Sequence, residues 1–86
     1  MEARLNSNVG SPGLQAALSR FPDKSVQIRQ LLLGRESFRG LCDDLAVADE
    51  ALGRVDMYST DLREERRREY EELIEALVQE IREFLA

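Results

Sequence analysis

The feature that most restricts how this chain folds is a run of apolar side chains spaced three or four residues apart through its middle. The members of the run are Phe38, Leu41, Leu45, Ala48, Leu52 and Val55. This spacing brings them onto one face of an α-helix, because about 3.6 residues complete each turn. We therefore predict a long amphipathic helix over about residues 35–55.

A second run with the same spacing follows after a short break at residues 56–60. Its members are Tyr70, Leu73, Leu77, Ile81 and Phe84. They predict another long helix, over about residues 61–85, which folds back antiparallel so that the two apolar faces meet. The seam of this helical hairpin then consists of Phe38, Leu41, Leu45, Leu52, Val55, Tyr70, Leu73, Leu77, Ile81 and Phe84.

The first part of the chain carries weaker signals. Residues 1–11 contain too few apolar side chains to offset the entropy of ordering them, so we expect a disordered tail there. Ser11 and Pro12 are typical of the start of a short helix, with the hydroxyl as the cap and the proline in the first turn. A second short helix is expected to run from a cap at Asp23 to a left-handed terminus at Gly34.

The length of the chain limits how such a fold is stabilised. Eighty-six residues make one small domain, which we place at residues 12–86. Two helices of this size usually need a third element or a partner chain. We therefore expect an all-α domain in which one or two short helices precede a long antiparallel two-helix hairpin, completed as a helical bundle by dimerisation.

The apolar segments are too short and too interrupted for a membrane protein. None approaches the roughly 20 consecutive apolar residues of a spanning helix. The amino-terminal residues also lack the apolar stretch of a secretion signal, so a cytoplasmic location is expected.

Charge is unevenly distributed along the chain. Residues 1–34 contain four Lys or Arg and two Asp or Glu, a net charge of +2, and the whole chain carries −5, so residues 35–86 carry −7. An acidic surface repels phosphate backbones, which argues against nucleic-acid binding through the consecutive Arg66, Arg67 and Arg68. Successive helical residues also point about 100° apart, so we favour a solvated helix supported by ion pairs. The expected pairs are Glu64 with Arg68, Arg67 with Glu71 and Arg68 with Glu72.

Residues that usually carry catalysis or bind metals are scarce. The chain has no His, and its Glu side chains therefore lack the Glu-x-x-His motif of di-metal helical bundles. Neither a Gly-rich phosphate loop nor a nucleophile motif is present. Cys42 is either a redox-sensitive thiol or a small buried apolar residue, and the adjacent Asp43 and Asp44 favour the second reading because they disfavour a thiolate. We expect no enzyme activity, no cofactor and no metal site.

Several residues, at particular spacings, resemble the pattern of a known family. They are Ile28 with Leu31, Phe38 with Leu41 and Asp43, Asp49 with Leu52, Arg54, Val55 and Asp56, and the segment 77–81. At these positions the sequence resembles the small uncharacterised bacterial proteins called YdcH-like, over about residues 28–86. The resemblance implies a long antiparallel helical hairpin, and it implies no function because that family has no assigned activity.

These features favour a non-catalytic function. We expect self-association, as a homodimer, or interaction with another protein. Met57, Tyr58, Phe84 and Leu85 are the apolar side chains that a single hairpin buries least easily, and either a partner or the fold itself covers them. The alternative is an acidic adaptor or inhibitor that docks on another protein, with nucleic-acid binding through residues 66–68 a distant third. No nucleic acid, membrane or small-molecule substrate is expected as a partner.

Overall fold

The computed structural model describes residues 11–85, and its regular elements there are all helices. In chain order these are α2 (Pro12–Arg20), the 3₁₀ helix η1 (Pro22–Lys24), α3 (Ser25–Gly34), α4 (Glu36–Gly53), the 3₁₀ helix η2 (Val55–Met57) and α5 (Thr60–Phe84). Except for Ser11, the disordered tail predicted at residues 1–11 lies outside the described residues. Ser11 is the N-cap of α2, and its hydroxyl accepts a hydrogen bond from the backbone N–H of Leu14 at 3.2 Å.

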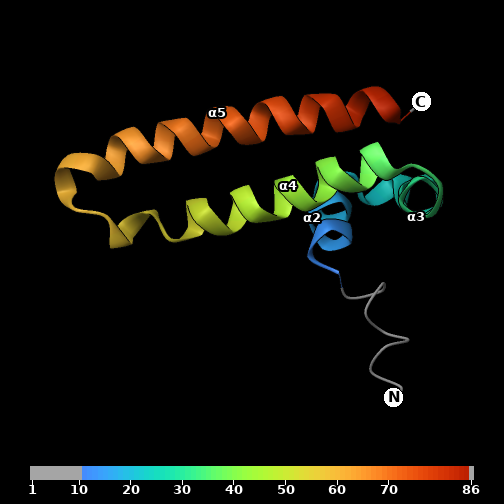
Figure 1. Cartoon of the computed structure of the whole chain (residues 1–86), viewed down its shortest axis with the longest axis horizontal. Coiled ribbons are helices and arrows are strands. Elements are labelled where there is room, and N and C mark those ends of the chain that lie inside the picture. The colour runs from blue at the N-terminus through green and yellow to red at the C-terminus, as the bar shows by residue number, and fades with distance from the viewer. Residues whose placement is uncertain (1–10, 86) are drawn as a thin grey trace, which may run out of the picture.

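The predicted hairpin is confirmed: α4 and α5 lie side by side and antiparallel, joined by the short segment that contains η2 (Figure 1). Both helices end within two residues of the predicted bounds. Phe38, Leu45, Leu77 and Ile81 are among the buried side chains of the seam. At one end of the hairpin, the rings of Phe38 and Phe84 meet edge to face with their centroids 5.3 Å apart.

The third layer that so small a fold needs is supplied by α2, which packs against α4. Leu14, Ala16 and Ala17 of α2 are buried in the same core as the hairpin seam. From α3, Ile28 is fully buried in that core. The sequence predicted these two short helices but did not assign them a packing partner.

Gly13 allows α2 to approach α4 closely. A Cβ atom added at this position would lie 3.2 Å from both the backbone N of Asp43 and the backbone carbonyl carbon of Cys42. It would also lie 2.5 Å from the Asp43 carboxylate, which is able to rotate away, whereas the two backbone atoms are fixed within α4. Gly13 therefore contributes close helix packing, which outweighs its low helix propensity.

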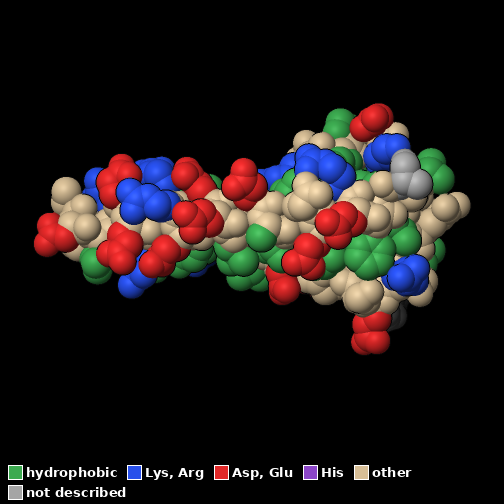
Figure 2. Space-filling view, turned by 90° about the horizontal axis from the view of Figure 1, so that it is seen from above, with side chains coloured by type: hydrophobic (Ala, Val, Ile, Leu, Met, Phe, Trp, Pro, Cys, Tyr) green, Lys and Arg blue, Asp and Glu red, His purple; other side chains and the backbone are tan. Residues whose placement is uncertain are grey.

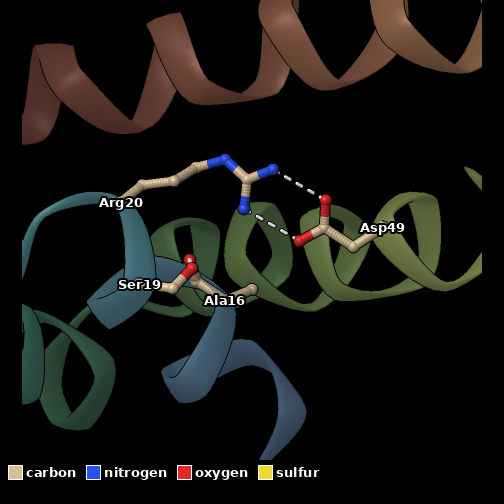
Figure 3. Close-up of polar contacts among 4 residues, drawn as sticks. All are labelled: Ala16, Ser19, Arg20 and Asp49. Atoms are coloured by element: carbon tan, nitrogen blue, oxygen red, sulfur yellow. Dashed lines mark hydrogen bonds and ion pairs between the residues drawn. The ribbon is translucent and has the colours of Figure 1, made fainter. Parts of the chain in front are cut away.

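An ion pair fixes the other end of α2. Both guanidinium NH₂ groups of Arg20 donate to the carboxylate of Asp49 on α4, at 2.7 and 2.8 Å (Figure 3). Both side chains are about one-third exposed, so the pair is partly shielded from water. On the same turn of α2, the Ser19 hydroxyl donates a hydrogen bond to the backbone carbonyl of Ala16 at 3.0 Å. Ser19 therefore bonds within α2, whereas Arg20 makes the contact with α4.

The hairpin is longer than the layer that covers it. The helices α2 and α3 lie at the end where α4 begins and α5 ends, and we call this end the head (Figure 1). The other end projects from the head as a narrow arm, which we define as residues 50–73 (Figure 2). Within the arm, Val55 alone is buried.

The register of α5 differs from the prediction at one turn. Leu73 was assigned to the seam, but its side chain is 47% exposed, and the adjacent Ile74 is buried instead. The spacings Tyr70–Leu73–Leu77 and Tyr70–Ile74–Leu77 both satisfy the three-or-four rule, so spacing does not distinguish them. Only one of two consecutive residues is able to face α4, because they point about 100° apart.

Two local signals near α3 were wrong. Asp23 does not cap a helix, because residues 22–24 form η1 and α3 begins at Ser25 without a side-chain cap. Gly34 does not adopt a left-handed conformation, since no glycine among the described residues has a positive φ. The chain instead leaves α3 through Arg35 in an extended conformation and enters α4 directly.

The packing of Gly13 gives a first testable prediction. We expect Gly13→Ala to lower the free energy of unfolding by about 1 kcal/mol, because the added methyl group forces α2 away from the α4 backbone. Gly40→Ala is the matched control: Gly40 is in α4 with nothing within 4 Å of the added Cβ, so we expect a gain of about 0.5–1 kcal/mol. Urea denaturation followed by circular dichroism measures both changes. A Gly13→Ala protein as stable as the Gly40→Ala protein would contradict this account.

Candidate interaction surface

One side of the α4–α5 hairpin is the side on which α2 packs. On α4, this side presents Asp49, which binds Arg20. On α5, it presents Arg82, whose guanidinium lies 5.6 Å from the ring centroid of Phe21. Val78 is also on this side, because it lines a shallow hollow together with Arg20. Contacts with α2 and the residue that follows it therefore cover this side in the head.

The opposite side of the hairpin carries exposed apolar residues. Val47 is two residues from Asp49, a rotation of about 200° around α4, and is 66% exposed. Leu73 is five residues from Val78, a rotation of about 140° around α5, and is 47% exposed. Leu62 lies eleven residues before Leu73, close to three full turns, so it shares the same side and is 40% exposed.

Two alanines complete this surface. The same rotation rule places Ala51 beside Val47 on α4 and Ala76 beside Leu73 on α5, and both side chains are at least partly exposed. We call the set Val47, Ala51, Leu62, Leu73 and Ala76 the open face. Figure 2 shows that hydrophobic side chains reach the surface along the arm between charged ones. Besides α5 and η2, the described helices that contact α4 are α2 and α3, which lie at the head.

The tip of the arm is held by polar and aromatic contacts. The hydroxyls of Tyr58 and Tyr70 are 3.3 Å apart, and the Arg66 guanidinium lies 5.8 Å from the ring centroid of Tyr58. The hydrogen bond with Tyr58 is the main cause that raises the pKa of Tyr70. Met57, beside this cluster, is 82% exposed.

The arginines near the tip pair within the arm. Asp56 lies 3.8 Å from Arg63 and 3.7 Å from Arg67, and Arg66 contacts Glu69 at 2.8 Å. The hydrogen bond to Glu69 is the main cause that raises the pKa of Arg66. The expected pairs of Glu64 with Arg68, Arg67 with Glu71 and Arg68 with Glu72 do not form among residues 11–85, and Arg67 pairs with Asp56 instead.

The predicted seam residues fall into three groups. Phe38, Leu45, Val55, Leu77 and Ile81 are buried. Leu41, Leu52, Tyr70 and Phe84 are partly buried. Leu73 is exposed and belongs to the open face. Of the four side chains at the hairpin ends, Phe84 and Leu85 are partly covered by the core, whereas Met57 and Tyr58 stay exposed.

Sequence reasoning did not find the open face. The signal was clear only for Val47, which lies about 100° or more from the buried positions of α4. Leu73 lies only about 40° from the buried Leu77, so the spacing alone placed Leu73 in the seam. Exposed single apolar residues are normal on protein surfaces, however, and only the tertiary contacts show that Val47, Leu62 and Leu73 share one uncovered side.

Cys42 is completely buried in the core beside α2. Burial is the main cause that raises the pKa of its thiol from 9.0 to about 11, and the carboxylate of Asp43 adds to the rise. A neutral thiol in this position is a small apolar core residue, as the sequence favoured.

Other kinds of site have little support in the described part of the chain. Residues 11–85 contain no group of three or more His, Cys, Asp or Glu side chains arranged to hold a metal ion. No helix in that range is long and apolar enough to cross a bilayer. Comparison with known protein families, curated proteins and solved structures finds no match to this chain. Membership of the YdcH-like family therefore stays a prediction.

The burial of Cys42 gives a second testable prediction. We expect the native thiol to react with Ellman's reagent about 100-fold more slowly than the thiol of the denatured chain, because a pKa two units higher lowers the thiolate fraction by that factor. Stability is affected in the same direction. Above about pH 9 the unfolded chain ionises Cys42 while the folded chain does not, so the free energy of unfolding falls as the pH rises from 9 to 11.

The control is Cys42→Ala, which removes the thiol and leaves the other titrating groups in place. Its unfolding free energy should fall less steeply between pH 9 and pH 11 than that of the parent protein, even though its stability at neutral pH is lower. Equal slopes in denaturant titrations of the two proteins would show that the thiol is not shielded in the folded chain.

Proposed function

We propose that this protein is a non-catalytic protein-interaction module and that the open face is the surface through which it binds. The single observation that carries the proposal is the uncovered apolar side of the hairpin, with Val47, Leu62 and Leu73 exposed by 40–66%. None of these three side chains belongs to the core that the helices of residues 11–85 form.

The apolar side chains of this surface supply part of the free energy of binding. Full burial of a Leu or Val side chain contributes about 1.5–3 kcal/mol, and a half-exposed side chain retains roughly half of that for a partner. Several such residues on one side of a rigid hairpin form the kind of patch that marks an association surface. The charged residues around it supply a polar rim.

A second candidate is the adaptor or inhibitor that docks through the short helix α3. Val26 and Leu33 of α3 are 68% and 78% exposed. Leu33 also lines a hollow of about 450 Å³ between α2, α3 and α4, whose walls include Arg29 and Arg39. This surface has two exposed large apolar side chains against three on the open face, and we rank it second.

Nucleic-acid binding through the arginine cluster stays third. Arg66 and Arg67 are engaged by Glu69 and Asp56, so phosphate contacts would have to displace these carboxylates. Binding that weakens steeply with salt and disappears in Arg66→Glu with Arg67→Glu would favour this alternative over the proposal.

Site-specific photo-cross-linking in the native cell tests the proposal. We expect benzoylphenylalanine at position 73 to give a cross-linked protein product, and the same group at position 75 to give none, because Glu75 is exposed on the α2 side of α5. The product from position 73 should disappear when Val47→Asp is added, since that change places a charge on the same face. If positions 47, 62 and 73 give no product, the proposal is wrong.

A further inference from the structure

A hollow of about 450 Å³ lies where α2, α3 and α4 meet in the head. Its volume is within the range of about 300–1,000 Å³ that is typical of sites for small ligands. Three of its lining side chains are apolar: Leu14 of α2 is buried, Leu32 of α3 is partly buried, and Leu33 of α3 is 78% exposed. They form an apolar wall, and Leu33 gains the most from being covered because it is the most exposed of the three.

Two arginines line the same hollow, Arg29 from α3 and Arg39 from α4. Among residues 11–85, neither guanidinium pairs with a carboxylate. Arg39 donates a hydrogen bond to the backbone carbonyl of Leu32 in the last turn of α3, which holds its guanidinium beside the apolar wall. A guanidinium has five N–H donors, so both arginines retain donors for an anion.

One carboxylate, that of Asp43, also lines the hollow. It lies at the first turn of α2, since a Cβ atom added to Gly13 would be 2.5 Å from a carboxylate oxygen of Asp43. The N-terminal end of a helix carries a partial positive charge, which favours a carboxylate at this position. The charge of Asp43 is therefore partly compensated by α2, and the two arginines leave the hollow with a net positive charge.

The sequence around the hollow has the same sign of charge. Residues 24–39 contain four Lys or Arg and one Asp or Glu, a net charge of +3, although the whole chain carries −5. A concave site with apolar walls also concentrates the field of the charges that line it. This part of the head therefore attracts anions, in contrast to the acidic hairpin.

From these observations we infer that the hollow binds an amphipathic carboxylate, a small molecule with one apolar chain and one carboxylate, such as a medium-chain fatty acid. The apolar chain packs against the three leucines, and the carboxylate accepts hydrogen bonds from Arg29 and Arg39. A protein partner would require a larger surface, because a specific protein interface buries about 800 Å² on each side. None of the lining residues belongs to the open face, so this inference goes beyond the proposed function and does not depend on it.

Titration of the full-length, isotope-labelled chain with decanoate below its micelle concentration, followed by heteronuclear NMR, tests the inference. We expect saturable shifts of the backbone amides of residues 29–33 and 39–43. Arg29→Gln and Arg39→Gln should each raise the dissociation constant at least about five-fold, because each removes a charge-assisted hydrogen bond. The matched control is Arg68→Gln, which removes the same charge from an exposed position of α5 and should leave the constant unchanged. The same spectra show whether each variant stays folded.

Two further probes separate the carboxylate from the apolar chain. Decyltrimethylammonium has the same chain with the opposite charge, and acetate has the carboxylate without the chain. We expect both to bind at least about ten-fold more weakly than decanoate, because each lacks one of the two groups that the hollow recognises.

Three results would overturn the inference. The first is the absence of saturable shifts at residues 29–33 with decanoate, as when another segment of the chain already fills the hollow. The second is equal binding of decanoate and decyltrimethylammonium, or equal binding by the parent protein and the two arginine variants, because the arginines then do not recognise the carboxylate. The third is a set of shifts centred on Val47 and Leu73, which would place the ligand on the open face.

Discussion

The structure depends on α4 being packed from two directions at once. A helix of this length is not stable in water by itself, and α4 also contains Gly40 and Gly53, which weaken it. On one side α5 supplies Leu77 and Ile81, and on the other α2 supplies Leu14 and Ala17. The remaining elements are arranged around this central helix, and the open face is the side of the hairpin that this arrangement leaves uncovered.

The sequence predicted the large elements because their signal is repeated. Six apolar residues in the first run and five in the second leave little freedom for either helix, and the short break between them requires a turn. Single-residue signals were less reliable. Asp23 and Gly34 are residue types that often cap the start and the end of a helix. The packing of Ile28 into the core, however, fixes where α3 lies, and the backbone conformation at both ends of α3 is set by that packing.

The candidate surface was harder to predict because it is defined by absence of contact. Leu73 and Ile74 are equivalent in spacing, and the choice between them depends on the exact rotation of α5 against α4. Likewise, Gly13 has low helix propensity in the sequence, and its role is visible only when the backbone of Asp43 is placed next to it. Such features depend on contacts between residues about thirty positions apart, which no local pattern encodes.

The division of the hairpin into a head and an arm allows the length of α4 and α5 to change without changing the head. The buried residues are concentrated outside the arm, in which Val55 is buried and Leu52 packs against the edge of the core. Inserting or deleting about seven residues, two turns, in each of α4 and α5 would keep both helices in phase and leave the head unchanged. The reach of the hairpin is thus adjustable in steps of roughly 10 Å, so related chains of different length are able to share one head.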